Sequence, residues 1–205
     1  MNTKKILITG SSGLIGSSCV EYYCKKNFSV VGIDNNMRAK FFGADGSTIN
    51  SKKNLEKKYV NYTHYETDIR SKEEIFKIFE QISPDAIIHC AAQPSHDLAA
   101  KIPFDDFTVN AENSIFYGTL SYNKVYGDKP NYLNLEEKEF RWDFKDKEYQ
   151  GGINENLGVD QTKHSLFGCS KLSADVIVQE YGRYFDMNTV CLRGGCLTGS
   201  NHSGV

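Results

Sequence analysis

The sequence predicts an α/β fold built on a doubly wound parallel sheet. Three observations lead to this prediction. Short apolar runs alternate with helical patterns along residues 4–92, a glycine-rich turn follows the first run directly, and no internal repeat interrupts the order. Such alternation is typical of parallel sheets with helices on both faces. We expect one domain over residues 1–205, with strands in the order 3-2-1-4-5-6.

The composition is that of an ordinary globular protein. Of the 205 residues, 24 are Lys or Arg and 26 are Asp or Glu, and hydrophobic residues make up 40%. The near-zero balance argues against nucleic acid as a partner, because nucleic-acid-binding domains usually have a basic excess. No apolar stretch approaches the roughly 18 residues that span a bilayer, and no signal peptide is evident. We therefore expect a cytoplasmic protein without a membrane partner, and read its six cysteines as reduced thiols rather than a metal site.

The first elements follow from apolar periodicity and boundary residues. Lys4–Thr9 is an apolar run that ends at glycine, which is typical of a buried parallel strand. Residues 14–26 place apolar side chains at helical spacing and end in two lysines, which favour a helix C-terminus. Phe28–Ile33 predicts the second strand. Residues 35–58 are polar and irregular, and predict a surface loop with one helical turn.

The later elements continue this alternation. Tyr59–Thr67 alternates in polarity and predicts the third strand. Ser71, followed three residues later by a glutamate, predicts the start of a helix that Pro84 and its neighbour end. Ala86–Ala92 is apolar and predicts the fourth strand. Residues 168–185 repeat apolar side chains at helical steps and predict a long amphipathic helix.

The turn between the first strand and first helix has the spacing Gly-x-x-Gly-x-x-Gly. One glycine permits a tight turn, another lets the backbone approach a pyrophosphate, and the third allows close helix–strand packing. The helix N-terminus offers N–H groups and a partial positive charge to phosphates. The turn favours a dinucleotide site, with a simple tight connection as the alternative. The residues predicted to bind there are Gly10, Ser12, Gly13, Leu14, Ile15 and Gly16.

Acidic residues at strand ends extend the predicted cofactor site. Asp34 lies 21 residues after Gly13, close to the ~20 expected for a carboxylate that binds ribose hydroxyls. Such a carboxylate repels a 2′-phosphate, so we expect NAD in preference to NADP, with Arg38 weakening the preference. For Asp68, a plain helix-entry role is the open alternative. The further predicted contacts are Asn35, Asp68, Ile69, Ala91, Ala92 and Gln93.

These motifs resemble the extended short-chain dehydrogenases/reductases, in particular NAD-dependent nucleotide-sugar epimerases and dehydratases of the CDP-paratose 2-epimerase branch. The segments that show the resemblance are residues 32–38, 41–43, 123–127, 164–171 and 193–199. The resemblance implies a Rossmann sheet, NAD as cofactor and a CDP- or UDP-linked hexose as substrate. It also implies 2-epimerisation through a keto intermediate, and is compatible with a homo-oligomer.

The resemblance further implies a Tyr-x-x-x-Lys pair and a nearby Ser or Thr for proton transfer and sugar orientation. Lys171 fills the lysine position, where it is also implied to hold the nicotinamide ribose, but Phe167 stands at the tyrosine position. Ser121 and Tyr122 lie at or beside the Ser/Thr position. We therefore expect Lys171, Tyr122 and Ser121 to be the catalytic residues.

The missing tyrosine leaves three hypotheses open. Another group takes over proton transfer, with Cys169 and His164 as further candidates; the protein binds NAD with weak or no catalysis; or the chain is an incomplete family member. Only ten residues, 111–120, separate Asn110 from Ser121, fewer than a crossover helix and a strand require. We therefore expect a gap near 111–120 and a chain lacking most of the family's smaller C-terminal substrate domain.

Overall fold

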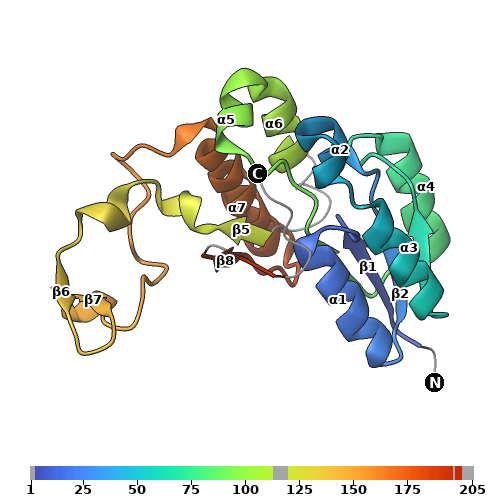
Figure 1. Cartoon of the computed structure of the whole chain (residues 1–205), viewed down its shortest axis with the longest axis horizontal. Helices are drawn as coiled ribbons and strands as arrows, with labels where there is room; N and C mark the ends of the chain where they lie inside the picture. The colour runs from blue at the N-terminus through green and yellow to red at the C-terminus, as the bar shows by residue number, and fades with distance from the viewer. Residues whose placement is uncertain (1–2, 113–119, 196, 200–205) are drawn as a thin grey trace.

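The computed structural model describes residues 3–112, 120–195 and 197–199, with residues 120–124 described by their backbone. Its main feature is a four-stranded sheet in the order β3-β2-β1-β4 (Figure 1). All three strand pairs are parallel. The predicted α/β class and the first four positions of the strand order are therefore confirmed. The strands are β1 (Lys5–Thr9), β2 (Ser29–Ile33), β3 (Tyr62–Tyr65) and β4 (Ala86–His89).

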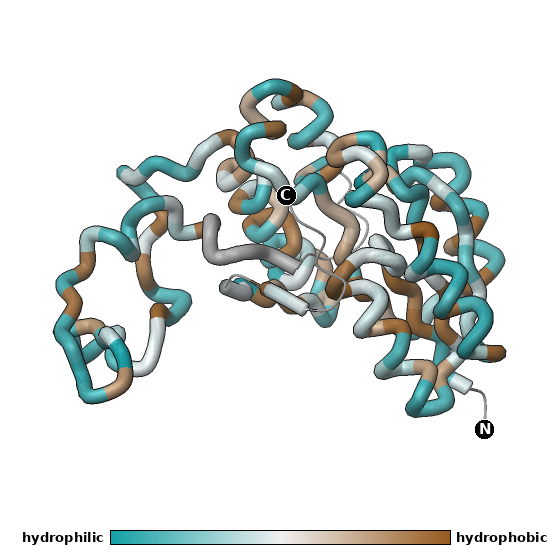
Figure 2. The backbone as a smooth tube through the Cα atoms, in the orientation of Figure 1, coloured by the Kyte–Doolittle hydropathy of each residue, from teal (hydrophilic) through white to brown (hydrophobic). Residues whose placement is uncertain are grey.

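Helices cover both faces of this sheet. Alternate side chains of β1 point to opposite faces, because successive residues of a strand alternate. Ile6 and Ile8 pack with Val20 of the first helix, whereas Leu7 packs with Ile75 of the fourth. Figure 2 shows apolar stretches along the central strands and hydrophilic ones on the outer helices. The helices of this half are α1 (Leu14–Lys25), α2 (Met37–Phe42), α3 (Ile49–Lys58), α4 (Lys72–Ile82), α5 (His96–Lys101) and α6 (Pro103–Asn110).

The predicted loop over residues 35–58 is wrong, because α2, the short 3-10 helix η1 (Ala44–Gly46) and α3 fill most of it. In α3 only Leu55 is buried, and this side chain joins the core between α1 and the sheet. One buried residue in ten gives almost no periodic signal, so tertiary packing decides the helix. The helix start at Ser71 is confirmed, although the Ser71 side chain makes no capping hydrogen bond.

The rest of the described chain forms a second, smaller region around α7 (Ser165–Phe185). Two short strands, β5 and β8, pair in parallel beside this helix. An antiparallel hairpin of β6 and β7 projects away from the four-stranded sheet, at the left of Figure 1. The remaining elements are β5 (Leu120–Tyr122), η3 (Asn123–Tyr126), η4 (Lys129–Tyr132), β6 (Leu135–Glu137), β7 (Trp142–Phe144), η5 (Lys147–Tyr149) and β8 (Leu192–Gly194).

Beyond β4 the predicted sheet order is confirmed for the parallel pairing of the fifth strand with the sixth (β5 with β8), but the predicted pairing of β4 with β5 is wrong. Among the described residues, β5 and β8 form a separate two-stranded sheet and do not continue the main one. β5 has three residues, and only ten residues, 111–120, connect α6 to Ser121, so little chain is present to extend the sheet. The predicted gap itself falls mainly on residues 113–119, outside the described residues. No helix among the described residues is long and apolar enough to cross a membrane.

Candidate functional site

A cavity of about 710 Å³ lies at the carboxyl ends of β1, β2 and β4, the edge where open parallel sheets bind ligands. Its walls bring together most of the residues predicted from the sequence, from segments far apart in the chain. The predicted residues that line it are Gly10, Ser12, Gly13, Leu14, Ile15, Gly16, Asp34, Asn35, Arg38, Asp68, Ile69, Ala91 and Ala92.

The glycines of the turn allow three backbone segments to meet. Gly10 adopts a φ of +63°, and a Cβ there would lie 2.7 Å from the Ala91 nitrogen. A Cβ on Gly16 would lie 2.0 Å from the Gly10 carbonyl oxygen. The start of α1 therefore rests on the turn, and the turn rests on the chain just after β4. No larger side chain fits at either position without moving the backbone.

Ser12 shows how this turn suits a phosphate group. Its hydroxyl oxygen is buried in the cavity wall and has no hydrogen-bond partner. A buried, unpaired hydroxyl is costly, so a polar ligand is the natural partner. Ser12 also lies beside the N-terminus of α1, whose first N–H groups have no intrahelical acceptor. The residues present therefore fit the pyrophosphate of a dinucleotide.

Asp34 ends β2 and is held in the cavity wall by backbone donors. The Ser12 N–H donates to Asp34 Oδ2 at 3.1 Å, and the Asn36 N–H donates to Asp34 Oδ1 at 2.8 Å. Arg38 follows in α2, with its guanidinium 5.1 Å from the centroid of the Phe42 ring. The carboxylate is thus fixed where the sequence places a ribose contact, with a cation on the next helix.

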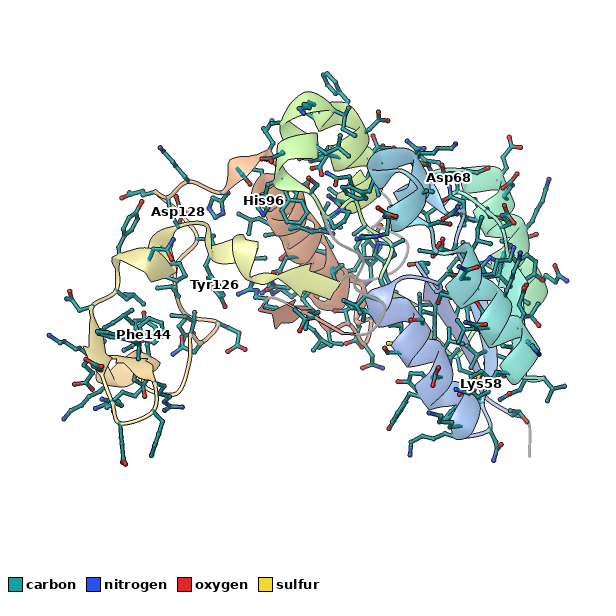
Figure 3. The ribbon with its side chains drawn as sticks, viewed as in Figure 1. Lys58, Asp68, His96, Tyr126, Asp128 and Phe144 are labelled. Atoms are coloured by element: carbon teal, nitrogen blue, oxygen red, sulfur yellow. The ribbon has the colours of Figure 1, made fainter. Side chains whose placement is uncertain are left out.

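Asp68 lies on the side of the cavity formed by the four-stranded sheet (Figure 3) and is tied into a charge cluster. Arg70 donates to Asp68 Oδ2 at 2.8 Å and to Asp105 Oδ1 at 3.1 Å. Burial alone would raise the pKa of Asp68, but hydrogen bonds from Arg70 lower it below the usual value. Asp68 is therefore an anion whose position Arg70 fixes.

Sequence reasoning missed the wall that α2 and α3 provide, because it read residues 35–58 as a loop. The turn between these helices and the start of α3 close this side, and Thr48 Oγ1 donates to Asp34 Oδ1 at 3.4 Å. For this wall, the segment 41–43 was singled out in the sequence only by the family resemblance, and not by a pattern of its own. The missed lining residues here are Met37, Phe41, Gly46, Ser47, Thr48, Asn50 and Ser51.

At the other end of the cavity, Phe167 of α7 and His96 of α5 form the wall. Their ring centroids lie 4.5 Å apart, and His96 Nδ1 is 3.0 Å from Ser165 Oγ. Figure 3 shows His96 where α5 meets α7. Lys171 lies one turn further along α7, with its ammonium 5.9 Å from the centroid of the Phe167 ring. An apolar ring thus occupies the place between the cavity and the buried lysine.

Lys171 is 1% exposed and lies behind the cavity wall rather than in it. Burial lowers the pKa of this lysine to about 8, although Asp106 and Cys90 act to raise it. Burial raises the pKa of Asp106, against hydrogen bonds from Ser170 and Gln93. A lysine with a lowered pKa therefore shares a poorly solvated region with a carboxyl group, just behind Phe167.

Gln93 belongs to this polar network and, like Lys171, does not line the cavity. Gln93 Nε2 donates to Asp106 Oδ1 at 2.9 Å, and Ser170 Oγ donates to Asp106 Oδ2 at 2.8 Å. Asn110 donates to the same carboxyl group at 2.8 Å and to the Gln93 carbonyl at 3.1 Å. The network joins α6 and α7 to the segment after β4. The only sequence signal for it was the i, i+4 spacing of Asp106 and Asn110.

The other residues predicted to transfer protons either lie outside the described side chains or do not line the cavity. The side chains of Ser121 and Tyr122 lie outside the described part of the structure. Cys169 is exposed on α7. His164 Nε2 lies 2.7 Å from the Val159 carbonyl oxygen, which engages one ring nitrogen outside the cavity.

Comparisons with known proteins place the chain in a family. Residues 6–116 match the sequence model of the NAD dependent epimerase/dehydratase family. CDP-paratose 2-epimerase of Salmonella typhi is 30% identical over 210 residues, covering 95% of this chain and 58% of that protein. The chain thus spans little more than half the length of this relative.

Solved structures show the same fold. The UDP-Glc/GlcNAc 4-epimerase of Campylobacter jejuni aligns with a TM-score of 0.71 at 20% identity, over 93% of this chain and 53% of that one. The UDP-glucose 4-epimerase of Thermus thermophilus, solved with NAD, aligns with a TM-score of 0.66 at 22% identity, over 92% and 54%. NAD, the predicted cofactor, is confirmed at the level of the family. By its sequence match over residues 6–116, this chain belongs to the NAD-dependent epimerase/dehydratase family.

Proposed function

We propose that residues 1–205 form the NAD-binding domain of a nucleotide-sugar epimerase. The proposed reaction is 2-epimerisation of a CDP- or UDP-linked hexose through a keto intermediate. The 30% identity to a CDP-paratose 2-epimerase supports the choice of carbon, and the relatives named 4-epimerases support the substrate class. Because the chain spans about half of these relatives, the activity is proposed for the whole protein. A cytoplasmic location and a homo-oligomer remain predictions.

Several of the predicted residues have a role in this proposal. The glycine turn and Ser12 would hold the pyrophosphate, and Asp34 the ribose hydroxyls. Bound NAD would supply a reversible hydride acceptor. Ala91 and Ala92 would pack against the cofactor, because small side chains leave room along the end of β4. Lys171 would act from behind the wall, through its positive charge.

Lys171 is the single observation that most supports catalysis. Burying a lysine costs free energy unless its charge is paired, and groups whose pKa is perturbed by such burial cluster at functional sites. In this proposal Ser121 or Tyr122, which lie at or beside the family's Ser/Thr position, moves the proton in place of the tyrosine that Phe167 replaces. His96 is a further candidate, because it lines the cavity in contact with Phe167 and imidazole readily exchanges protons near neutral pH.

Phe167 favours the second candidate, an NAD-binding protein of the same fold with weak or no catalysis. The two candidates separate in one experiment on the purified protein and on a Lys171→Met variant. Mass spectrometry identifies the copurified nucleotide, and absorbance of reduced nicotinamide is then followed after adding a CDP- or UDP-hexose. NMR of the sugar reports which carbon is inverted.

Inversion at C2 that is lost in Lys171→Met supports the epimerase. Retained NAD with neither reduction nor inversion, for the whole protein and each hexose, supports the binding protein instead. If neither NAD nor a related nucleotide copurifies, and if no NAD affinity can be measured, both candidate functions are contradicted.

A further inference from the structure

Two cysteines from distant parts of the chain meet beside the cofactor cavity. Cys19 lies in α1, three residues after Gly16 and therefore on a neighbouring part of the same helix face. Cys90 directly follows β4, and its N–H donates to the Thr9 carbonyl at 3.1 Å. Gly16 rests on Gly10, and a Cβ on Gly10 would lie 2.8 Å from the carbonyl carbon of Cys90. These close approaches bring α1 near the end of β4.

The two thiols are in contact and partly accessible. Cys19 and Cys90 both pack against the cluster around Val20 and Cys24, and their thiols interact with each other. Neither thiol residue is fully buried, and Cys90 lines the cavity. Cys24 is buried within that cluster. Among the described residues, no group of three or more His, Cys, Asp or Glu side chains is placed to hold a metal ion, so the pair is a dithiol and not part of a larger ligand set.

The two thiols are chemically unequal. Interaction with the Cys90 thiol lowers the pKa of Cys19 to about 7, against the opposing effect of burial. The same interaction, together with burial, raises the pKa of Cys90. Since the thiolate is the reactive form of cysteine, Cys19 is the nucleophile of the pair near neutral pH and Cys90 its neutral partner.

We propose that Cys19 and Cys90 form a redox modification site that reacts with small disulfides such as oxidised glutathione. The Cys19 thiolate attacks one sulfur of the small disulfide, forming a mixed disulfide and releasing one small thiolate, which takes up a proton. Cys90 then loses its proton and attacks the Cys19 sulfur, which releases the second small thiol and leaves a Cys19–Cys90 bond. One small disulfide is reduced to two thiols, and the protein dithiol is oxidised by two electrons.

This cross-link would affect the cofactor site. A disulfide brings two sulfurs to about 2.05 Å, closer than two thiols that are only in contact, so the two side chains, or α1 and the chain after β4 that carry them, must move toward each other. Both segments form the cavity wall. We expect the oxidised protein to bind NAD about fivefold more weakly, and NAD to favour the dithiol by the same factor, because coupling between sites is reciprocal.

The test incubates purified protein with oxidised glutathione, blocks remaining thiols and maps disulfides by mass spectrometry. A loss of two hydrogens and a Cys19–Cys90 peptide are expected, and NAD affinity is then measured by calorimetry before and after reduction. Cys19→Ser should abolish the cross-link, whereas Cys169→Ser, at an exposed thiol on α7, is the matched control and should retain it.

Glutathione that stays on Cys19 without a Cys90 link, or a link from Cys19 to Cys24, would overturn the proposed pair. Equal NAD affinity of the oxidised and reduced forms would overturn its effect on the cofactor. The wild-type map decides the pairing even if Cys19→Ser fails to fold. Both readouts are independent of sugar epimerisation, so they stand whether or not that activity is found.

Discussion

The ammonium of Lys171 lies 5.9 Å from the centroid of the Phe167 ring, one turn earlier in α7. Residues four apart on a helix share a face, so the ring and the cation meet as the spacing predicted. The ring is 3% exposed and lines the cavity, whereas the lysine lies behind it. The lysine is thus positioned to act on a group at position 167, but the phenyl ring at that position cannot exchange a proton.

Changing Phe167 to Tyr should create an unusually acidic phenol. The Lys171 charge would stabilise the phenolate and lower its pKa below the usual value of about 10. The measurement is the ultraviolet absorbance of ionised tyrosine as a function of pH, with the wild-type curve subtracted. A midpoint at least about one unit lower is expected. If Phe167→Tyr has the same midpoint with and without a second Lys171→Met change, Lys171 does not act on this position.

Lys171 should also make stability depend on pH. Its pKa falls from 10.5 in the unfolded chain to about 8 in the folded one. Below pH 8 both states hold the proton, and between the two values only the unfolded state does, so the free energy of unfolding rises with pH in that window. Between pH 7.5 and 9.5, the free energy of unfolding of the wild type should rise by about 2 kcal/mol more than that of Lys171→Met. Urea unfolding at both pH values measures this difference. The same pH dependence in the wild type and in Lys171→Met would show that Lys171 is solvated.

The sequence was sufficient for the parts of the fold that have strong local signals. β1, β2 and α1 have short apolar runs, a glycine boundary and a helical repeat, and all three were predicted. α3 was missed because Leu55 is its one buried residue. The predicted order places the fifth strand beside the sixth, and β5 and β8 pair in that way, but the separation of this pair from β4 was not predicted, because three-residue strands carry little pattern of their own.

For the site, the predicted residues that line the cavity include positions where backbone geometry limits the choice of residue. The glycines at 10 and 16 are required by contacts that a Cβ would block. Gln93 was expected at the cofactor but is fully buried against Asp106 and Asn110. Which polar side chains turn inward depends on α6 and α7 packing together. This long-range packing leaves little trace in a local pattern.

Gly16→Ala should destabilise the fold far more than Gly13→Ala. A Cβ on Gly16 would lie 2.0 Å from the Gly10 oxygen, whereas one on Gly13 would lie 3.3 Å from the same atom. The first forces α1 away from the turn, which costs about 1–3 kcal/mol by the usual scale of overpacking, and the second needs only a small adjustment. Thermal unfolding without NAD compares the two variants. Equal losses would mean that α1 does not pack on the turn this closely.

Asp34→Asn should weaken the preference for NAD over NADP. The amide keeps an acceptor for the Ser12 or Asn36 N–H group but removes the negative charge. That charge repels a 2′-phosphate, and an interaction of about 1–2 kcal/mol corresponds to roughly tenfold in affinity. We expect NADP to bind roughly tenfold more tightly, with NAD binding slightly weaker through the lost ribose contact. Calorimetry with both cofactors measures the ratio of the NAD and NADP affinities.

Asp45→Asn, at an exposed acid in η1 that does not line the cavity, is the control for a general loss of charge. An equal change in both variants would assign the effect to net charge, and equal affinity of the unmodified protein for NAD and NADP would remove the role of Asp34 altogether. If only Asp34→Asn changes the ratio, the carboxylate discriminates at close range, as its fixed position at the end of β2 requires.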